Sequence, residues 1–553
     1  MEIILITAAI LAALIIKGIY DKNMYEKKLV RNVRDSFGRE PKKNITQARA
    51  QVLPYYAEHK EKSDCHVDRI TRNDTDLDRI YDRLNSCKCA IGEEYLYYLL
   101  VNPSSSIEEL NERERVISHL YNDREKRESL GVMLSRIGML KNISAYEYMN
   151  RLKDITPDSN VMHIVQALSL AASIALIFFS PVYGIMLTIV MFFLNVITYF
   201  KRKTLIEGYF SIVFYILNTL DAAGKLLKTE DSELSVYYDR IKRAAGKFSK
   251  MRHNSVFLLS GAGAGPLQLI FDYVRMAFHI DLIKFNSICL FFAAHTDDFE
   301  KIFETVGFLD CMLAAASYRK LHEDGYSVPV LSSGDKRYIR ALNLAHPLLN
   351  DPVTNDLDIS RPVLLTGSNA SGKSTFLKTV ALNAILAQTI HTVLAQSYEA
   401  PVFHVMTSMA LRDDIASGES YYIVEIKSLK RIIDEKGSVP VLCFIDEVLR
   451  GTNTVERIAA STQILRGLGD ANALCLAATH DIELTHLLED VYDNYHFEEQ
   501  IEEDEIIFDY KLKKGRAASR NAISLLRIMG YPQDTVEAAA GMAERYVETG
   551  EWR

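Results

Sequence analysis

The chain has 553 residues, of which 48% are hydrophobic and 25% charged, and its formal net charge at pH 7 is -8. This length allows more than one sizeable core, and this composition excludes disordered, collagen-like and low-complexity chains. The net negative charge argues against a protein that lives mainly on nucleic acid, although it leaves room for a local basic patch. The cysteines are odd in number (7) and widely spread, so we expect no disulfide framework and a reducing compartment.

The N-terminal segment 1–20 is predicted to be a transmembrane anchor. Ile3 to Ile16 is an apolar run with no basic residue before it, whereas Lys and Arg recur from Lys17 to Arg34. A cleaved signal peptide carries its positive charges on the other side, so the pattern favours an uncleaved anchor whose N-terminus lies outside. Segment 21–60, which is basic in its first half, is predicted to be a juxtamembrane linker that touches anionic lipid headgroups rather than DNA.

The segment 161–200 contains no Asp, Glu, Lys or Arg and is interrupted by Ser180-Pro181 and Gly184. Because a spanning helix needs about 20 apolar residues, this segment predicts a transmembrane hairpin with a tight turn in the middle. A helix pair buried in a soluble core would normally keep a polar stripe, which is missing here. Three cations follow at 201–203, so we expect three spans in total, a multi-pass membrane location and a cytoplasmic C-terminal part.

From about Tyr338 onwards, short β-rich runs alternate with helical segments, which is typical of an α/β domain. A predicted strand at 362–366 and a predicted helix from Thr375 flank the sequence G-x-x-x-x-G-K-S at 367–374. In such a loop the glycines let backbone N–H groups surround phosphates, the lysine reaches the β and γ phosphates, and the serine ligates Mg²⁺. We therefore expect ATP and Mg²⁺ as cofactors, with Lys373 and Ser374 in these two roles.

Two further predicted strands end in polar residues suited to nucleotide hydrolysis. The strand 441–445 runs into Asp446 and Glu447, and the strand 474–478 ends in Thr479-His480. An aspartate in this place can enter the Mg²⁺ shell, and the adjacent glutamate can polarise the attacking water. His480 is then a candidate sensor of the γ-phosphate.

Four segments in this order resemble the motifs of the MutS mismatch-repair ATPases: 366–375, 416–420 with Glu425, 446–454 and 478–484. The resemblance extends to 345–349, 510–515 and 530–532, and so covers a predicted ATPase domain at 336–553. It is weaker upstream, at 92–113 and around Leu309-Asp310, where it implies a helical core at 61–160 and a helical lever or connector at 201–335. The expected fold is an α/β P-loop ATPase domain of the ABC/MutS type that follows an all-α core and lever, with transmembrane helices.

The resemblance also implies residue roles. Glu447, His480 and Lys373 would be catalytic, Ser374 and Asp446 would hold Mg²⁺, and His346 would contact the base or form only a turn. Ser417, Gly418 and Ser420 would close over the ATP of a partner subunit, which implies a homodimer through the ATPase domains. The nucleotide-binding loop would consist of Gly367, Ser368, Asn369, Ala370, Ser371, Gly372, Lys373, Ser374 and Thr375.

The sequence departs from that family in its DNA-reading parts. The resemblance leaves no segment for a mismatch-sensing domain, and the uncharged hairpin 161–200 stands where a DNA-gripping clamp normally interrupts the lever. We therefore expect a membrane-anchored dimeric ATPase that moves helical arms against lipid or an unknown protein partner. Three alternatives stay open: a DNA mismatch repair or recombination protein that binds duplex DNA, an ABC-type transporter ATPase, and a scaffold that has lost turnover.

Overall fold

The computed structural model describes residues 2–549 except for 42–44, 60–62, 141–142, 155–158, 227–230, 250–265, 335, 369–370, 410–420, 436, 451, 503–504, 518–522, 524–525 and 528. The chain divides into two compact units, each built from three stretches of sequence. The helical unit comprises Met1–His59, Asp82–Tyr98 and Arg115–Leu321, and the sheet unit comprises Lys60–Tyr81, Leu99–Glu114 and His322–Arg553. All seven cysteines lie in described residues, and no disulfide joins them, as the sequence predicts.

Within its described residues, the helical unit contains only helices as regular elements. Helices α4, α5 and α6 contribute residues to both units. The bounds are α1 Glu2–Ser36, α2 Ile45–His59, α4 Leu77–Leu84, α5 Ala90–Val101, α6 Ile107–Asn122, α7 Arg124–Ile137, α8 Ala145–Asp154, α9 Asn160–Leu176, α10 Pro181–Leu226, α11 Ser235–Lys247, α13 Pro266–Ala277, α14 Ile280–Ala294 and α15 Thr296–Leu321.

Helix α15 forms the centre of the helical unit, and it is buried along most of its length. The carboxylate of Asp310, on this helix, accepts hydrogen bonds from the backbone N–H groups of Lys88 and Cys89 at 2.9 and 3.0 Å. A Cβ atom at Gly92 would lie 2.1 Å from Oδ2 of Asp310, so only glycine allows this close approach. Two positions at which the sequence weakly resembles the MutS core therefore meet in the folded chain.

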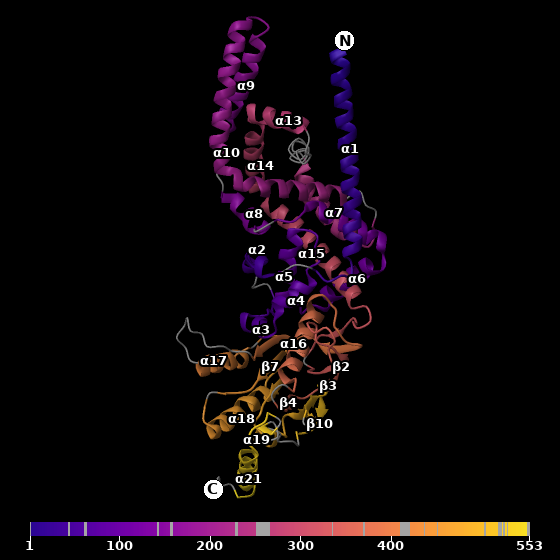
Figure 1. Cartoon of the computed structure of the whole chain (residues 1–553), viewed down its shortest axis with the longest axis vertical. Coiled ribbons are helices and arrows are strands. Elements are labelled where there is room, and N and C mark those ends of the chain that lie inside the picture. Colours follow the sequence, from indigo (N-terminus) through magenta and orange to yellow (C-terminus); the bar gives the residue numbers. More distant parts are fainter. Residues whose placement is uncertain are drawn as a thin grey trace. The chain divides into compact units, whose positions relative to one another are not determined.

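Helices α9 and α10 run side by side as a hairpin (Figure 1). At its tip, a Cβ atom at Gly184 would lie 2.5 Å from the backbone nitrogen of Ile177, which explains the glycine in this turn. Helix α10 has 46 residues and does not end at the 201–203 cations, where the sequence predicts the end of the hairpin. Charged side chains do not interrupt a helix when the backbone hydrogen bonds continue.

One helix in the described part of the chain, Pro181–Thr204, is long and apolar enough to cross a membrane, and 17% of its most apolar stretch is buried. Helix α9, with 17 residues, is shorter. Helix α1 has 35 residues and runs through the predicted anchor into the predicted linker, but the side chains of residues 2–15 lie outside the described set. Of the three expected spans, one meets the length and composition of a spanning helix in the described residues, so the expectation of several spans is not supported.

The sheet unit contains a six-stranded sheet in the order β12-β9-β4-β8-β7-β6. Its strands pair in parallel except for β12, which is antiparallel to β9. The strands are β12 Lys513–Lys514, β9 Asp493–His496, β4 Val363–Thr366, β8 Ala473–Ala478, β7 Val441–Asp446 and β6 His404–Ser408. The core strands β4, β7 and β8 are buried on both faces, which is why they are continuous apolar runs in the sequence.

Two smaller sheets and several helices complete this unit. A four-stranded sheet has the order β1-β5-β2-β3, and an antiparallel pair joins β10 to β11. The bounds are β1 Val330–Ser332, β5 Ser397–Pro401, β2 Ile339–Leu344, β3 Asn355–Ile359, β10 Glu499–Glu502, β11 Glu505–Phe508, α3 Arg69–Asp74, α16 Lys373–Thr389, α17 Tyr421–Ile433, α18 Thr454–Asp470, α19 Ile482–Leu487 and α21 Gln533–Thr549.

Two stretches that the sequence assigns to the helical core pack in the sheet unit. On α3, the buried carboxylate of Asp74 accepts hydrogen bonds from Oγ1 of Thr407 at 2.7 Å and from the backbone N–H of Met409 at 2.9 Å. On α6, the guanidinium of Arg113 donates to the carbonyl oxygens of Gln388 and Thr389 at 3.2 and 2.6 Å. These bonds fix α3 to β6 and the first half of α6 to the end of α16.

Candidate functional site

A cleft of about 540 Å³ in the sheet unit is lined by the residues that follow β4, β7 and β8. These strands run parallel, so the loops at their carboxyl ends meet at one edge of the sheet, where α/β proteins bind ligands. The lining residues are Leu344, His346, Leu349, Asp351, Pro352, Val353, Asn355, Ser368, Gly372, Lys373, Ser374, Thr375, Phe376, Thr379, Asp446, Glu447, Arg450, His480, Phe497 and Tyr510.

The loop between β4 and α16 depends on two glycines in the left-handed half of conformational space. Gly367 has φ +145° and Gly372 has φ +103°. A Cβ atom at Gly367 would also lie 2.9 Å from the carbonyl oxygen of Phe497. Gly372 precedes the first residue of α16, so the loop delivers the N-terminal N–H groups of this helix to the cleft.

Lys373, the first residue of α16, is buried with its ammonium group inside this loop. Its Nζ donates to the carbonyl oxygens of Gly367 and Ser368 at 2.7 and 2.8 Å. Burial lowers the pKa of Lys373, while the carboxylates of Asp446 and Glu447 oppose this shift. A phosphate oxygen carries negative charge, so it would be a stronger acceptor for the Lys373 ammonium group than either carbonyl oxygen.

Ser374 and Asp446 bring two oxygen donors together across the cleft. Oγ of Ser374 donates to Oδ2 of Asp446 at 2.5 Å. A hydroxyl and a carboxylate are the hard oxygen ligands that Mg²⁺ prefers, and Mg²⁺ usually takes only one or two protein ligands alongside phosphates and water. The donor chemistry therefore suits Mg²⁺ at this position.

Glu447 lies at the end of β7 in a strained backbone conformation, with φ +60°. Its backbone N–H donates to the carbonyl of Ala478 at 2.9 Å, and its carboxylate contacts Nε2 of His480 at 3.1 Å and Nε of Arg450 at 2.5 Å. Burial raises the pKa of Glu447, but the hydrogen bond from His480 and the charges of Arg450 and Lys373 outweigh it and bring the pKa below its usual value. The carboxylate is therefore ionised at neutral pH and able to accept a proton.

The structure brings most of the predicted site residues together. Those that line the cleft are Ser368, Gly372, Lys373, Ser374, Thr375, His346, Asp446, Glu447 and His480. Gly367 and Ser371 belong to the same loop without lining the cleft. Asn369, Ala370, Ser417, Gly418 and Ser420 lie outside the described residues, so their roles stay predictions.

Three residues gain a structural role that sequence reasoning did not assign. Arg450 lies three positions after Glu447 in the loop that follows β7 and pairs with it, although this spacing predicts contact only within a helix. Tyr510 lines the cleft and lies 3.1 Å from where a Cβ atom of Gly372 would be, although no local pattern indicates this long-range contact. Glu425 is buried and accepts the backbone N–H of Leu449 at 2.5 Å, which holds the loop after β7 in a conformation where Leu449 has φ +59°.

A parallel sheet whose first strand–loop–helix junction carries G-x-x-x-x-G-K-S defines the P-loop class of nucleotide-binding domains. Within this class, residues 363–546 match the family described as MutS domain V. This part of the chain is therefore similar to MutS domain V.

Curated relatives show the same similarity. The chain is 33% identical over 239 residues to the DNA mismatch repair protein MutS of Thermus thermophilus, a match that covers 42% of this chain and 29% of the relative. It is 28% identical over 340 residues to MutS of Fervidobacterium nodosum, covering 58% and 41%. A third match, to MutS of Lactobacillus delbrueckii subsp. bulgaricus, has 32% identity over 270 residues and covers 46% and 31%. The chain thus spans less than half the length of each of these relatives.

Proposed function

We propose that this protein is a MutS-like ATPase that hydrolyses ATP in the cleft of the sheet unit. The observation that carries the proposal is the meeting of Lys373, Ser374, Asp446, Glu447 and His480 around one cleft. Lys373 binds the β and γ phosphates, and Ser374 and Asp446 hold Mg²⁺, which neutralises phosphate charge when it is bound. Glu447 orients and deprotonates the attacking water, and His480 holds the Glu447 carboxylate in place.

The test is ATP turnover and ATP binding in two variants of the full chain. Lys373→Ala removes the phosphate contact, so we expect both binding and turnover to fall. Glu447→Gln removes the base but keeps the shape, so we expect turnover to fall by about 100-fold or more while ATP stays bound. Lys430→Ala, an exposed lysine on α17, is the control and should behave as the wild type. Unchanged turnover in Lys373→Ala would refute the assignment.

A second part of the proposal is dimerisation through the ATPase domains. It is supported by the likeness of segment 416–420 to the MutS signature segment, in which Ser417, Gly418 and Ser420 would complete the site of a partner subunit. Analytical ultracentrifugation of Glu447→Gln should show a dimer with ATP and more monomer with ADP. A monomer in both states would contradict this part alone.

The third part is a membrane location, with the ATPase domain in the cytoplasm. It is supported by the absence of charge at 161–200 and by the exposure of large apolar side chains along the hairpin, among them Phe178 at 87% and Val182 at 75%. Exposed apolar surface of this extent is unfavourable in water and favourable in a lipid bilayer. The protein should stay in the membrane pellet after carbonate extraction and leave it only with detergent. A freely soluble product would remove this part of the proposal.

A DNA-binding role is the second candidate, because the relatives are named DNA mismatch repair proteins. When a protein contacts DNA phosphates, its affinity for duplex DNA falls steeply as the salt concentration rises. The slope of log affinity against log salt concentration is close in size to the number of phosphate contacts. Titration of matched and mismatched duplexes from about 50 to 200 mM salt tests this role. If no duplex binds at the lowest salt concentration, the membrane-coupled function stands alone.

A further inference from the structure

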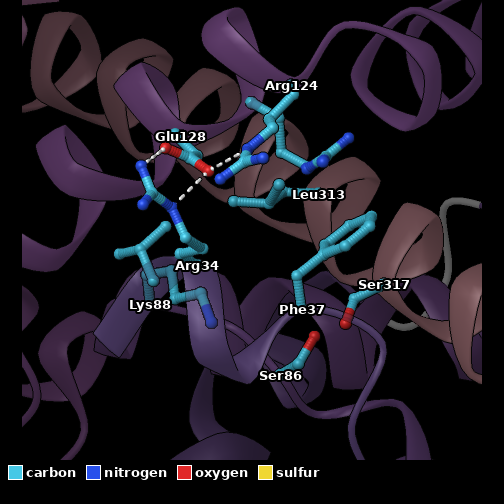
Figure 2. Close-up of a pocket in the computed structure, with 10 residues that line it drawn as sticks. Arg34, Phe37, Ser86, Lys88, Arg124, Glu128, Leu313 and Ser317 are labelled. Carbon is cyan, nitrogen blue, oxygen red and sulfur yellow. Dashed lines mark hydrogen bonds and ion pairs between the residues drawn. The ribbon is translucent and has the colours of Figure 1, made fainter. Parts of the chain in front are cut away.

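The helical unit contains a second cavity, of about 260 Å³, which we call the Arg34 cavity. It lies where the end of α1 meets α7, α15 and the segment between α4 and α5. Its lining residues are Val33, Arg34, Phe37, Ser86, Lys88, Arg124, Arg127, Glu128, Leu313 and Ser317. Figure 2 shows their side chains gathered from these separate elements around one space.

One carboxylate organises two of the cations in this cavity. Nε and Nη2 of Arg34 each donate to Glu128 at 2.9 Å, and Nε of Arg124 donates to the same carboxylate at 2.7 Å (Figure 2). The hydrogen bond from Arg34 is the main reason that the pKa of Glu128 falls to about 2, so this group stays ionised. These bonds occupy two donors of Arg34 and one of Arg124, whereas a guanidinium carries five.

The other two cations also donate hydrogen bonds to oxygen atoms of the protein. Nη1 of Arg127 donates to the carbonyl oxygens of Leu120 and Tyr121 at 2.9 and 2.8 Å, and its guanidinium carbon lies 3.9 Å from the ring centre of Phe37. Nζ of Lys88 donates to Oγ of Ser36 at 2.8 Å. Four cations and one carboxylate line the cavity, so its lining carries an excess of positive charge.

The cavity also has an uncharged part. Phe37 and Leu313 supply apolar surface, and Ser86 and Ser317 supply hydroxyl groups next to it (Figure 2). Val33 adds to the apolar lining. Guanidinium groups are the side chains best shaped to bind phosphate oxygens in pairs. We propose that the Arg34 cavity binds a small phosphomonoester, with the phosphate among Arg34, Arg124 and Lys88 and the organic part against Phe37.

The phosphomonoester has two possible sources, a soluble metabolite or a lipid headgroup, and the position of the cavity favours the soluble one. If α1 leaves the bilayer near residue 20, as the proposed anchor requires, Arg34 follows about 14 residues later, or about 21 Å along the helix. This distance puts the cavity beyond the headgroup layer. The volume of the cavity also lies below the range typical of sites for larger ligands, which disfavours a whole nucleotide.

The test is isothermal titration of glycerol 3-phosphate, and of inorganic phosphate, into the detergent-solubilised full chain. The Lys373→Ala background keeps phosphate out of the P-loop, so the result does not depend on the proposed ATPase function. We expect saturable binding that Arg124→Gln weakens by about tenfold or more, because it removes a charge-assisted donor. Arg151→Gln is the matched control, since Arg151 on α8 is similarly exposed and pairs with Glu147 four positions earlier, just as Arg124 pairs with Glu128 four positions later.

A parallel titration uses mixed micelles that contain phosphatidic acid, which carries the same phosphate on a lipid. Binding of the soluble esters with the expected loss in Arg124→Gln supports the proposal. Arg124-dependent binding of the micelles alone would overturn the soluble source. Absence of binding, or equal weakening by Arg124→Gln and Arg151→Gln, would overturn the site itself.

Discussion

At the scale of single residues, the contact between Glu447 and His480 has a consequence for pH dependence. The hydrogen bond from His480 helps to bring the pKa of Glu447 below its usual value, against the effect of burial. His480→Ala removes this influence, so the pKa of Glu447 rises and the carboxylate becomes protonated at a higher pH. We expect the acid limb of the ATPase pH profile to move to higher pH, apart from any fall in the maximum rate.

The control for this experiment is His486→Ala, because His486 is an exposed histidine on the neighbouring helix α19. Its acid limb should coincide with that of the wild type. An unmoved limb in His480→Ala would show that Glu447 is not the group whose protonation limits the rate.

Gly367 allows a second prediction at this scale, on stability. Alanine at this position combines φ +145° with a contact of 2.9 Å to a backbone oxygen, and a backbone atom cannot move aside cheaply. We expect Gly367→Ala to lower the free energy of unfolding by about 1–3 kcal/mol and to weaken ATP binding. Gly467→Ala is the opposite case, because this glycine lies in helix α18 with open space around its missing Cβ, and it should stabilise by about 0.5–1 kcal/mol. Denaturant unfolding of both variants measures the difference.

The meeting of the site side chains around one cleft was predictable from the sequence because the motifs that carry them are local. Lys373 and Ser374 follow a strand after the short loop 367–372, and Asp446 and Glu447 end a later apolar strand, so the motifs and their order indicated where they would meet. No role was assigned to Tyr510, because Gly372, which it approaches, lies far from it in the sequence. No role was assigned to Glu425 either, because its role depends on one buried hydrogen bond from the backbone N–H of Leu449. Long-range contacts of this kind leave no periodic signal.

At the scale of elements, α16 ends against a cation from a distant part of the chain. The guanidinium of Arg113, 96% buried as a side chain, donates to the last carbonyl groups of this helix, which lack partners within the helix. Arg113→Ala leaves the buried carbonyl oxygen of Thr389 without its donor, whereas that of Gln388 keeps the backbone N–H of Ser104 at 2.9 Å, so we expect a loss of about 1–3 kcal/mol in the free energy of unfolding. Arg361→Ala, which removes an exposed ion pair with Asp493, should cost less than about 1 kcal/mol. Equal losses would show that the helix end does not depend on Arg113.

The elements also show the limits of prediction from sequence. The predicted strands at 362–366 and 441–445 agree with β4 and β7, because buried parallel strands are continuous apolar runs. The continuation of α10 beyond residue 203 was missed, since charge marks the edge of a membrane segment but does not end a helix. The placement of α3 in the sheet unit was missed as well, because Asp74 finds its partners more than 300 residues away.

At the scale of the whole molecule, the division into units predicts how fragments will behave. A fragment of residues 336–553 contains all residues that line the cleft but lacks Asp74 and Arg113, both of which are bonded inside the sheet unit. We expect this fragment to unfold at a lower denaturant concentration than the same domain in the full chain. Co-expression with residues 60–114 should restore part of the lost stability, measured as a rise in the denaturant concentration at which the fragment unfolds. A fragment as stable as the full chain would contradict the composition of the sheet unit.

The uninterrupted course of α10 has a mechanical consequence. Its backbone hydrogen bonds continue from the tip of the hairpin to Leu226, although the helix bends below the hairpin (Figure 1). A break at residue 203 would have made a flexible joint, which absorbs a tilt applied at one end. An unbroken helix resists further bending, because its backbone hydrogen bonds would have to lengthen. Because α10 contacts both α9 and α7, a shift of α7 reaches the hairpin through one continuous element.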